Sequence, residues 1–304
     1  MKIIVAHSSP DWDAITSVWI LKRFLSGWEN AKVMFVLAGE RVSPLKKDQK
    51  DPVELIGNDE VIHVDTGLGP LDHHQTSDQN VSAASLCWEY VQRISPSVNS
   101  EQAISNEKNK QKMEAIERIV KWVVELDHFK EVFWENPASD RYELGLYGLL
   151  EGLMLTKPND NSYYVEFGML CLDAELANFE NRIFAEKEIK EKGKEFTTKW
   201  GKGIGIETIN DASIKLAQKM GFAIVVKRDP RKGFVRIKAT PYKEGVTKDV
   251  DLTLVYEKLH KMDPQASWYL HVSKKMLLNG SAKNPKMIPT TLSLDEIVKV
   301  VEAI

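Results

Sequence analysis

The chain has 304 residues, of which 43% are hydrophobic and 28% charged, and its formal net charge is −3. This length is about twice that of a typical domain, so we expect two domains with well-formed cores. Its only cysteines, Cys87 and Cys171, are far apart, which excludes a disulfide framework and a zinc ribbon. The sequence shows no secretory signal pattern and no run of about 18 apolar residues, so we expect a soluble cytoplasmic protein without a membrane partner.

Charge is divided unevenly along the chain. Residues 215–290 contain 16 Lys and Arg against 6 Asp and Glu, a balance of +10 that leaves −13 for the remainder. By itself such a bias is also typical of a solvated lysine-rich surface. The uneven charge has a functional explanation if the acidic part of the chain binds cations while the basic part faces an anion.

The first part of the chain alternates predicted strands with predicted helices. Short apolar runs predict strands at 2–6, 31–39 and 60–65, and apolar residues at helical spacing predict helices at 13–25 and 82–94. This alternation is typical of an α/β fold with a mostly parallel sheet flanked by helices.

The rest of the chain is predicted to be helical from about 101 to 199, followed by a smaller α/β domain. The charged run "EKEIKEKGKEFTTKW" is expected to form or join a linker helix, and Gly201, Gly203 and Gly205 are expected to mark the boundary. Beyond it, the pattern predicts a strand, a helix and two strands. We therefore expect a catalytic domain with its helical linker at 1–195 and a basic substrate-binding domain at 200–304.

Polar residues that suit metal binding lie where predicted strands end. His7 ends the first strand, Asp11 and Asp13 open the following helix, and Asp65 ends a later strand. Each aspartate alone is compatible with a helix cap or a turn. The carboxyl ends of parallel strands meet at one rim, however, so we expect the four side chains to lie together there.

Three motifs carry a family resemblance: "HSSPDWDA" at 7–14, "VDTG" at 64–67 and "DHHQ" at 72–75. In this order they resemble the DHH phosphoesterase superfamily, which includes RecJ-type exonucleases, nanoRNases, cyclic-dinucleotide phosphodiesterases and family II inorganic pyrophosphatases. "VDTG…DHHQ" together with "WYLHVS…NGS" (268–281) also resembles the melanocyte-proliferating-gene exonuclease branch. That branch departs from the HxxPDxDA form, which this chain keeps.

The resemblance implies a site for two metal ions per chain. The matching ligands are His7, Asp11, Asp13, Asp65, His73 and Asp127. Asp65 matches the ligand shared by both ions, whereas Asp127 could also be a polar residue at a helix end. Carboxylates with a minority of imidazoles suit Mn²⁺, our expected ion, with Mg²⁺ as the alternative.

Two further residues of the third motif match catalytic positions. His74 matches the position that faces the scissile phosphate, where it would donate to a phosphate oxygen. Asp72 would orient a histidine. Only seven positions separate Asp65 from Asp72, too few for a helical crossover, so Gly67, Gly69 and Pro70 predict a tight loop instead. His63 shares the strand phase of Asp65 but is predicted to be a structural histidine.

Contacts to the substrate are expected in the basic domain. Arg228, Arg231 and Arg236 lie around a predicted hairpin and suit a phosphate backbone. His271 matches the histidine of the resembling exonuclease branch. Trp268 and Tyr269 are equally compatible with core packing and with base stacking.

These features favour a metal-dependent phosphodiesterase or exonuclease that hydrolyses short single-stranded RNA or DNA. A small phosphorylated substrate is the other expectation, because inorganic pyrophosphatases and cyclic-dinucleotide phosphodiesterases share the motifs. A non-catalytic nucleotide-binding module is a further alternative. The sequence leaves the oligomeric state open, with a homodimer as one expectation.

Overall fold

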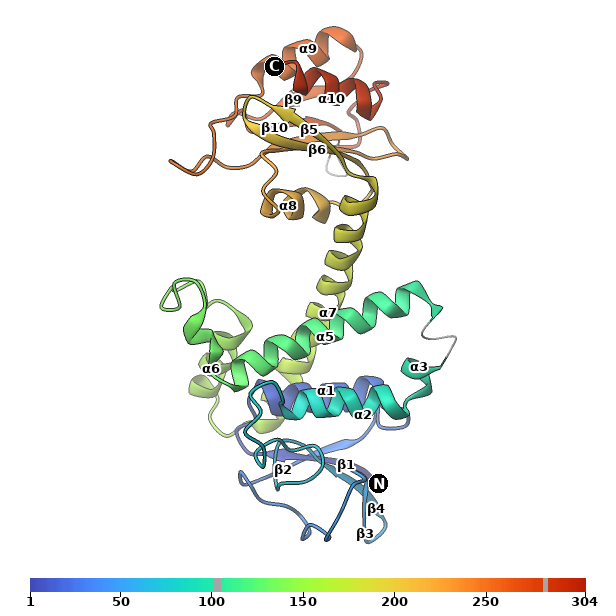
Figure 1. Cartoon of the computed structure of the whole chain (residues 1–304), viewed down its shortest axis with the longest axis vertical. Helices are drawn as coiled ribbons and strands as arrows, with labels where there is room; N and C mark the ends of the chain where they lie inside the picture. Colours follow the sequence, from blue (N-terminus) through green and yellow to red (C-terminus); the bar gives the residue numbers. More distant parts are fainter. Residues whose placement is uncertain (101–104, 281–283) are drawn as a thin grey trace. The chain divides into compact units, whose positions relative to one another are not determined.

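The computed structural model describes residues 1–100, 105–280 and 284–304. The chain forms two compact units, Met1–Glu180 and Asn181–Ile304, and the division falls inside helix α7 (Asn161–Lys192). Each unit contains a β-sheet with helices packed against it, which confirms the predicted α/β class (Figure 1). The domain limits 1–195 and 200–304 stay predictions, because compact packing does not show which segments fold independently.

The first unit is built around a four-stranded sheet in the order β2-β1-β4-β3. Its described elements are β1 (Lys2–His7), α1 (Trp12–Phe24), β2 (Lys32–Val36), β3 (Glu54–Ile56), β4 (Asp59–His63), α2 (Ala83–Ile94), α3 (Pro96–Asn99), α5 (Glu107–Asp127), the 3-10 turn η1 (Lys130–Phe133), α6 (Leu146–Thr156) and most of α7. β1 pairs in parallel with β2 and β4, and β3 is antiparallel to β4. The central β1 is buried from Ile3 to Ala6, as expected for a strand covered on both faces.

Helices α1 and α2 lie on one face of this sheet, and α5 packs against both (Figure 1). Both helices begin at strong caps. Asp11 caps α1, and Ser82 forms a capping box with Ser85 at the start of α2. The buried side chains of Trp19, Val91 and other residues join the three helices in one core. The caps fix where α1 and α2 begin, and the first amides of α2, those of Ala83 and Ala84, donate to Asp13 in the first turn of α1.

The second unit contains a six-stranded sheet in the order β5-β6-β7-β8-β10-β9. Its described elements are the end of α7, β5 (Lys194–Thr198), β6 (Gly201–Glu207), α8 (Ala212–Lys219), β7 (Ile224–Arg228), β8 (Val235–Ala239), α9 (Thr253–Met262), β9 (Trp268–Leu270), β10 (Met276–Asn279) and α10 (Leu294–Glu302). Among these described strands only β6 and β7 pair in parallel, and the other neighbours are antiparallel. The predicted order of strand, helix and two strands is confirmed in β6, α8, β7 and β8.

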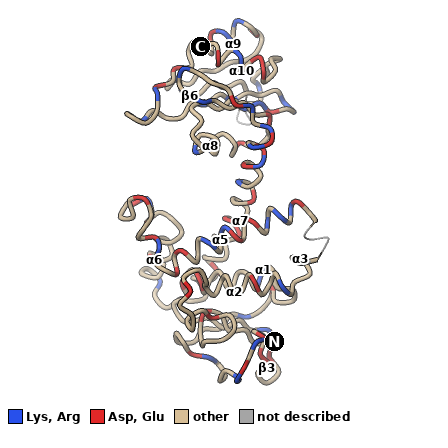
Figure 2. Tube along the Cα trace, viewed as in Figure 1, with Lys and Arg blue, Asp and Glu red and all other residues tan. Residues whose placement is uncertain are grey.

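The predicted linker helix ends earlier than the sequence suggested. Acidic and basic residues alternate along the later part of α7 (Figure 2), with i,i+4 pairs such as Arg182–Glu186, but the helix stops at Lys192. The next residues form β5, which pairs antiparallel with β6. The prediction of helix up to about 199 was therefore wrong over Lys194–Thr198.

Gly201, Gly203 and Gly205 lie within β6 and not in a connecting loop, and the domain boundary they were expected to mark stays a prediction. Packing explains two of them. A Cβ atom at Gly203 would lie 2.3 Å from the Phe196 ring, and one at Gly205 would lie 2.7 Å from Val298. These glycines let neighbouring side chains approach the strand closely.

None of the helices in the described part of the chain is long and apolar enough to cross a membrane.

Candidate metal centre

The side chains of the first motif lie at the C-terminal end of β1 and at the N-termini of α1 and α2. His7 is the last residue of β1, and the chain then turns into α1 through Ser9, which has a φ of 54°. Asp11 accepts hydrogen bonds from the amides of Asp13 (2.9 Å) and Ala14 (3.0 Å). The buried Asp13 carboxylate accepts from the amides of Ala83 (2.7 Å) and Ala84 (2.8 Å) at the start of α2. Both helix N-termini therefore favour negative charge at this point.

The second and third motifs are joined by a closed loop. Asp65 follows β4 with a left-handed φ of 53°, and its amide donates to the Leu71 carbonyl at 3.0 Å. The Asp72 amide donates to the Gly69 carbonyl at 3.1 Å. This is the tight loop predicted from the spacing, and it brings the Asp72–His74 triplet back beside Asp65.

The two carboxylate oxygens of Asp65 face two different groups of side chains. Oδ2 lies 3.2 Å from His7 Nε2, which is itself 3.9 Å from Asp11 Oδ2. Oδ1 lies 3.5 Å from His73 Nε2. Asp65 therefore bridges a His7 group and a His73 group.

The His73 group is completed by two carboxylates from distant parts of the chain. His73 Nε2 lies 3.7 Å from Asp13 Oδ2 and 3.5 Å from Asp127 Oδ2. Asp127 is the last residue of α5, 54 positions after His73 in the sequence. The structure thus brings all six sequence-predicted ligands together, although their binding of metal stays a prediction.

Three buried atoms of this cluster have no hydrogen-bond partner among the described residues: Asp65 Oδ1, His73 Nε2 and Asp127 Oδ2. Buried polar atoms are nearly always paired, so three convergent exceptions need an explanation. A divalent cation would satisfy all three at once. His7 fits this interpretation too: Nδ1 donates to the Ser8 carbonyl at 2.9 Å, and Nε2 faces Asp65 Oδ2 at 3.2 Å, so a cation between them would be bound by both.

The electrostatics of the cluster also favour a cation. Burial and the charges of Asp65 and Asp127 raise the pKa of Asp13 well above its usual value, and burial raises the pKa of Asp127. Contact with the Asp65 carboxylate raises the pKa of His73 to about 9. Burial lowers the pKa of His7, but the Asp65 hydrogen bond and the Asp11 charge outweigh it and bring the value to about 9. Crowded carboxylates that take up protons are the kind of group that a divalent ion stabilises.

Asp72 and His74 form a pair at the edge of the cluster, where His74 Nδ1 lies 3.8 Å from Asp65 Oδ1. Asp72 Oδ1 lies 2.6 Å from His74 Nδ1, and Asp72 Oδ2 accepts from the Leu68 amide at 2.6 Å. The His74 side chain is 59% exposed, whereas that of Asp72 is buried. Because Nδ1 is engaged, the exposed Nε2 edge of His74 is the one that can meet a substrate.

A buried network that the sequence analysis missed supports the Asp65 loop. The Arg41 guanidinium pairs with Glu54 and donates to the Gly67 carbonyl at 3.3 Å. Glu54 in turn lies 3.0 Å from His63 Nδ1, and His63 Nε2 accepts from the Val42 amide. The prediction that His63 is a structural histidine is confirmed. No local pattern marks Arg41 and Glu54, since their partners come from other segments.

His128 is a second residue that sequence analysis did not assign to the site. Its Nε2 donates to the Val81 carbonyl at 2.9 Å and lies 3.7 Å from Asp127 Oδ2, and its ring meets His73 edge-on at 5.8 Å. The only sequence signal was its position directly after Asp127. It offers a second imidazole, beside that of His73, at the edge of the His73 group.

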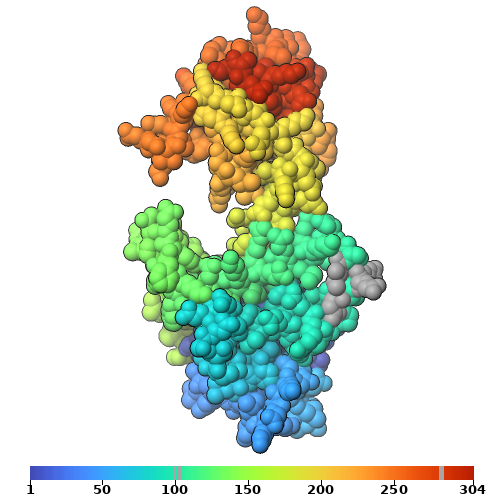
Figure 3. Space-filling model, viewed as in Figure 1, coloured from blue at the N-terminus to red at the C-terminus, as the bar shows by residue number. Residues whose placement is uncertain are grey.

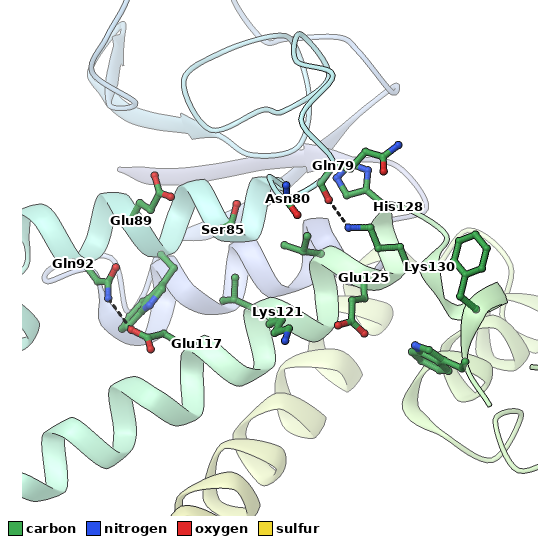
Figure 4. A pocket seen from close by; sticks show the side chains of 15 residues that line it. Gln79, Asn80, Ser85, Glu89, Gln92, Glu117, Lys121, Glu125, His128 and Lys130 are labelled. Atoms are coloured by element: carbon green, nitrogen blue, oxygen red, sulfur yellow. Dashed lines mark hydrogen bonds between the residues drawn. The ribbon is translucent and has the colours of Figure 1, made fainter.

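A groove of about 920 Å³ begins at His128 and runs between α2 and α5. Figure 4 shows Ser85 and Glu89 on α2, Lys121 and Glu125 on α5, and Gln79 and Asn80 near His128, with Gln92 of α2 donating to Glu117 of α5 at 3.3 Å. Lys130 donates to the Gln79 carbonyl at this end. The groove provides polar side chains and space next to the candidate metal centre.

The predicted substrate contacts in the second unit do not all lie together. Arg231 and Arg236 line a cavity of about 170 Å³ with Lys227 and Lys232. Lys227 and Arg236 are opposite each other on β7 and β8, and both pair with Asp211. By contrast, Arg228 pairs with Glu207, His271 bonds to Ser273, and neither lines this cavity. Trp268 is 9% exposed and belongs to the core, whereas Tyr269 is half-exposed.

No protein-family model and no curated protein matches the chain. Similar solved structures include an uncharacterized protein from Helicobacter pylori G27, with 14% identity and a TM-score of 0.23, over 100% of this chain and 99% of that one. RecJ from Thermus thermophilus in complex with Mg²⁺ has 12% identity and a TM-score of 0.29, and in complex with Mn²⁺ 12% and 0.28. Each RecJ match covers 99% of this chain but only 49% or 51% of RecJ. Similarity at this level assigns no activity or ligand, which must come from the side chains themselves.

Proposed function

We propose that this protein is a DHH-type phosphodiesterase that hydrolyses short single-stranded oligonucleotides with two divalent cations, Mn²⁺ in preference to Mg²⁺. The observation that carries the proposal is the position of Asp65, whose two oxygens face the His7 group and the His73 group separately. A carboxylate placed in this way is suited to hold two ions side by side.

The ligand groups divide between two ions. His7, Asp11 and Asp65 would hold one, and Asp13, Asp65, His73 and Asp127 the other. When bound, such a pair lowers the pKa of a coordinated water and neutralises charge on a phosphate. The absence of a thiolate among these donors favours Mn²⁺ or Mg²⁺ over a structural zinc.

His74 and Asp72 supply the proton chemistry of the chain itself. The exposed edge of His74 would donate to a phosphate oxygen or to the leaving oxygen as the ester bond breaks. Asp72 holds the ring at Nδ1, 2.6 Å from its Oδ1, and so fixes the orientation of the imidazole.

The surroundings of the centre favour an oligonucleotide over pyrophosphate. The groove that begins at His128 has room for nucleotides beyond the scissile phosphate, and pyrophosphate would leave it empty. The small cavity of the second unit, taken by itself, is lined by four basic residues against two acidic ones, Asp211 and Asp229, which pair with Arg236 and Arg231. The positive excess suits a backbone phosphate, with these two arginines as the principal contacts.

A substrate panel tests the proposal. Mn²⁺-loaded protein is incubated with pyrophosphate, a cyclic dinucleotide, and labelled RNA and DNA oligonucleotides from dinucleotide to twenty-mer. We expect oligonucleotides to be hydrolysed fastest, with activity lost in chelator. Turnover of pyrophosphate alone or of the cyclic dinucleotide alone would replace the proposal with the corresponding activity. Binding without turnover of any substrate would indicate a non-catalytic module.

A further inference from the structure

A second cavity, of about 330 Å³, lies in the first unit on another side of α5. Aromatic side chains dominate its wall: Trp122, Trp134, Tyr142, Tyr147 and Phe179. Five of its eleven lining residues are thus aromatic, compared with 9% of the whole chain. Concentration of rings at this level marks the cavity as a place where a flat, apolar group can bind.

The rings come from several elements that converge on one space. Trp122 lies on α5, Tyr147 on α6 and Phe179 on α7, whereas Trp134 and Tyr142 lie on the connection between α5 and α6. This connection, coloured green, projects from the surface of the first unit (Figure 3). The Trp134 and Tyr142 rings are 5.1 Å apart and tilted by 48°, so they form a pair at the wall rather than a closed stack.

The polar groups of the cavity narrow the class of ligand. Arg141 and Glu175 both line it, and they offer hydrogen-bond donors and an acceptor of opposite charge. With these charges offsetting each other, the cavity has no excess positive charge for a phosphate. A ligand with flat apolar faces and a polar edge fits this combination, which describes a nucleobase.

The position of Trp134 connects this cavity to the candidate metal centre. Trp134 also lines the groove that begins at His128, so one side chain forms a wall of both spaces. A chain with its phosphate at the metal centre could therefore follow the groove and place a base beyond it.

We propose that this aromatic cavity binds one nucleobase of the oligonucleotide substrate. The inference rests on the proposed function, because it assigns the ligand from the substrate class of that site. Stacking on rings discriminates little between bases, so the cavity would accept purines and pyrimidines alike. Stacking of the base would also add to the affinity for oligonucleotides, so the protein would prefer them over phosphates without a base.

Binding of a fluorescent base tests the inference without any hydrolysis. The full chain, freed of metal by chelator, is titrated into a short oligonucleotide that contains one 2-aminopurine, whose emission falls when the base is stacked. We expect quenching with the wild-type chain. Tyr142→Ala and Trp134→Ala should weaken binding roughly tenfold or more, and Tyr142→Phe should retain it.

Matched controls separate the cavity from general effects. Tyr242→Ala removes a half-exposed ring in the second unit and should bind like the wild type. An oligonucleotide in which every position is abasic, followed by calorimetry because it carries no fluorophore, should bind wild type and Tyr142→Ala equally. Because Tyr142 lies on an exposed connection, its variant is expected to fold even if Trp134→Ala does not.

The outcomes distinguish this inference from the proposed function. If oligonucleotides are hydrolysed but the Tyr142 variants bind the probe like wild type, the inference is wrong and the function stands. If quenching depends on Tyr142 but the protein hydrolyses no oligonucleotide, the base site is supported and the proposed activity is wrong. Absence of quenching by the wild type overturns the inference outright.

Discussion

His74 is held by Asp72 through two contacts with the same carboxylate oxygen. Asp72 Oδ1 lies 2.6 Å from His74 Nδ1 and accepts from the His74 amide at 3.1 Å. The imidazole is therefore fixed at both its backbone and its ring while most of its surface stays exposed. This arrangement suits a group that meets a substrate without binding metal.

The first prediction follows from this pair. His74→Ala should keep Mn²⁺ binding but lower kcat on the order of 10²-fold or more, because a positioned donor to the phosphate is lost. Asp72→Asn should lower kcat less, because an amide oxygen can still accept from His74 and hold the ring in place. Steady-state kinetics with calorimetric Mn²⁺ titration measure both effects. A kcat for His74→Ala equal to that of the wild type would remove His74 from the chemistry.

The second prediction concerns the loop that carries Asp65. Gly67 has a φ of 76°, and a Cβ atom there would lie 2.1 Å from Arg41 Cγ, whereas Gly57 has a φ of 60° with open space around it. Gly57→Ala therefore reports backbone strain alone. Gly67→Ala should cost about 1–3 kcal/mol more than Gly57→Ala in the free energy of unfolding, and it should weaken Mn²⁺ binding.

Urea unfolding and calorimetry on the two variants measure these quantities. The matched pair matters because both glycines adopt a left-handed backbone. Equal losses of stability, with Mn²⁺ affinity unchanged in both, would show that contact with Arg41 does not position the loop.

The third prediction concerns the basic cavity of the second unit. Arg236→Ala should raise KM for oligonucleotides and reduce by about one the slope of its logarithm against the logarithm of salt concentration. Mn²⁺ stoichiometry should not change. Lys258→Ala removes the same charge from an exposed position on α9 outside the cavity and serves as the control. Identical KM values and salt slopes in both variants would show that Arg236 acts only through the net charge of the protein and not through a contact with the substrate.

His271 provides a separate test of the family resemblance. Its ring bonds to Ser273 and lies outside the basic cavity. If the resemblance holds at this position, His271→Ala should raise KM with little change in the free energy of unfolding, since the residue is not part of the core. A KM that stays at the wild-type value would mean that the match to the exonuclease branch does not extend to this histidine.

The fourth prediction is a pH dependence of stability. Asp173 on α7 accepts two hydrogen bonds from Arg23 and one from Trp19 Nε1, both on α1. The Arg23 hydrogen bonds hold the pKa of Asp173 below its usual 3.8, so its stabilising effect is full above 3.8 and is lost as pH falls through the lower folded-state value. Because the pair is about 40% exposed, we expect Asp173→Asn to lose only about 0.2–1 kcal/mol at neutral pH.

Urea unfolding of wild type and Asp173→Asn at neutral pH and at a series of pH values descending from 3.8 checks this sign. The difference between the two proteins should shrink toward zero on acidification. A difference that is the same at all of these pH values would show that the ionised carboxylate is not what links α7 to α1.

Several parts of the fold and site could be predicted from the sequence because they depend on local chemistry. A strand that ends at His7 and a helix that opens at Asp13 follow from hydrophobic spacing and capping. The few residues between Asp65 and Asp72 required a tight loop, and the closed loop in the structure meets that requirement. The proximity of Asp127 to His73 could be predicted only from the family resemblance. Asp127 lies at the end of α5, a separate helix, so no local sequence pattern links it to His73.

Other features depend on contacts between distant segments and left no local signal. The charged residues that precede Lys194 favour a helix. The segment Lys194–Thr198 is a strand because it pairs with β6. Arg41, Glu54 and His63 form a buried network only after three segments fold together. The aromatic cavity likewise gathers rings from α5, α6 and α7 that are scattered in the sequence.

Calorimetric titration with Mn²⁺, checked by elemental analysis, tests the central claim most directly. The account predicts two Mn²⁺ per chain for the wild type and none bound tightly by Asp65→Ala, because that substitution removes the ligand shared by both groups. Asp173→Asn, which removes a carboxylate outside the cluster, should still bind two. Two Mn²⁺ bound by Asp65→Ala with wild-type affinity would contradict the account.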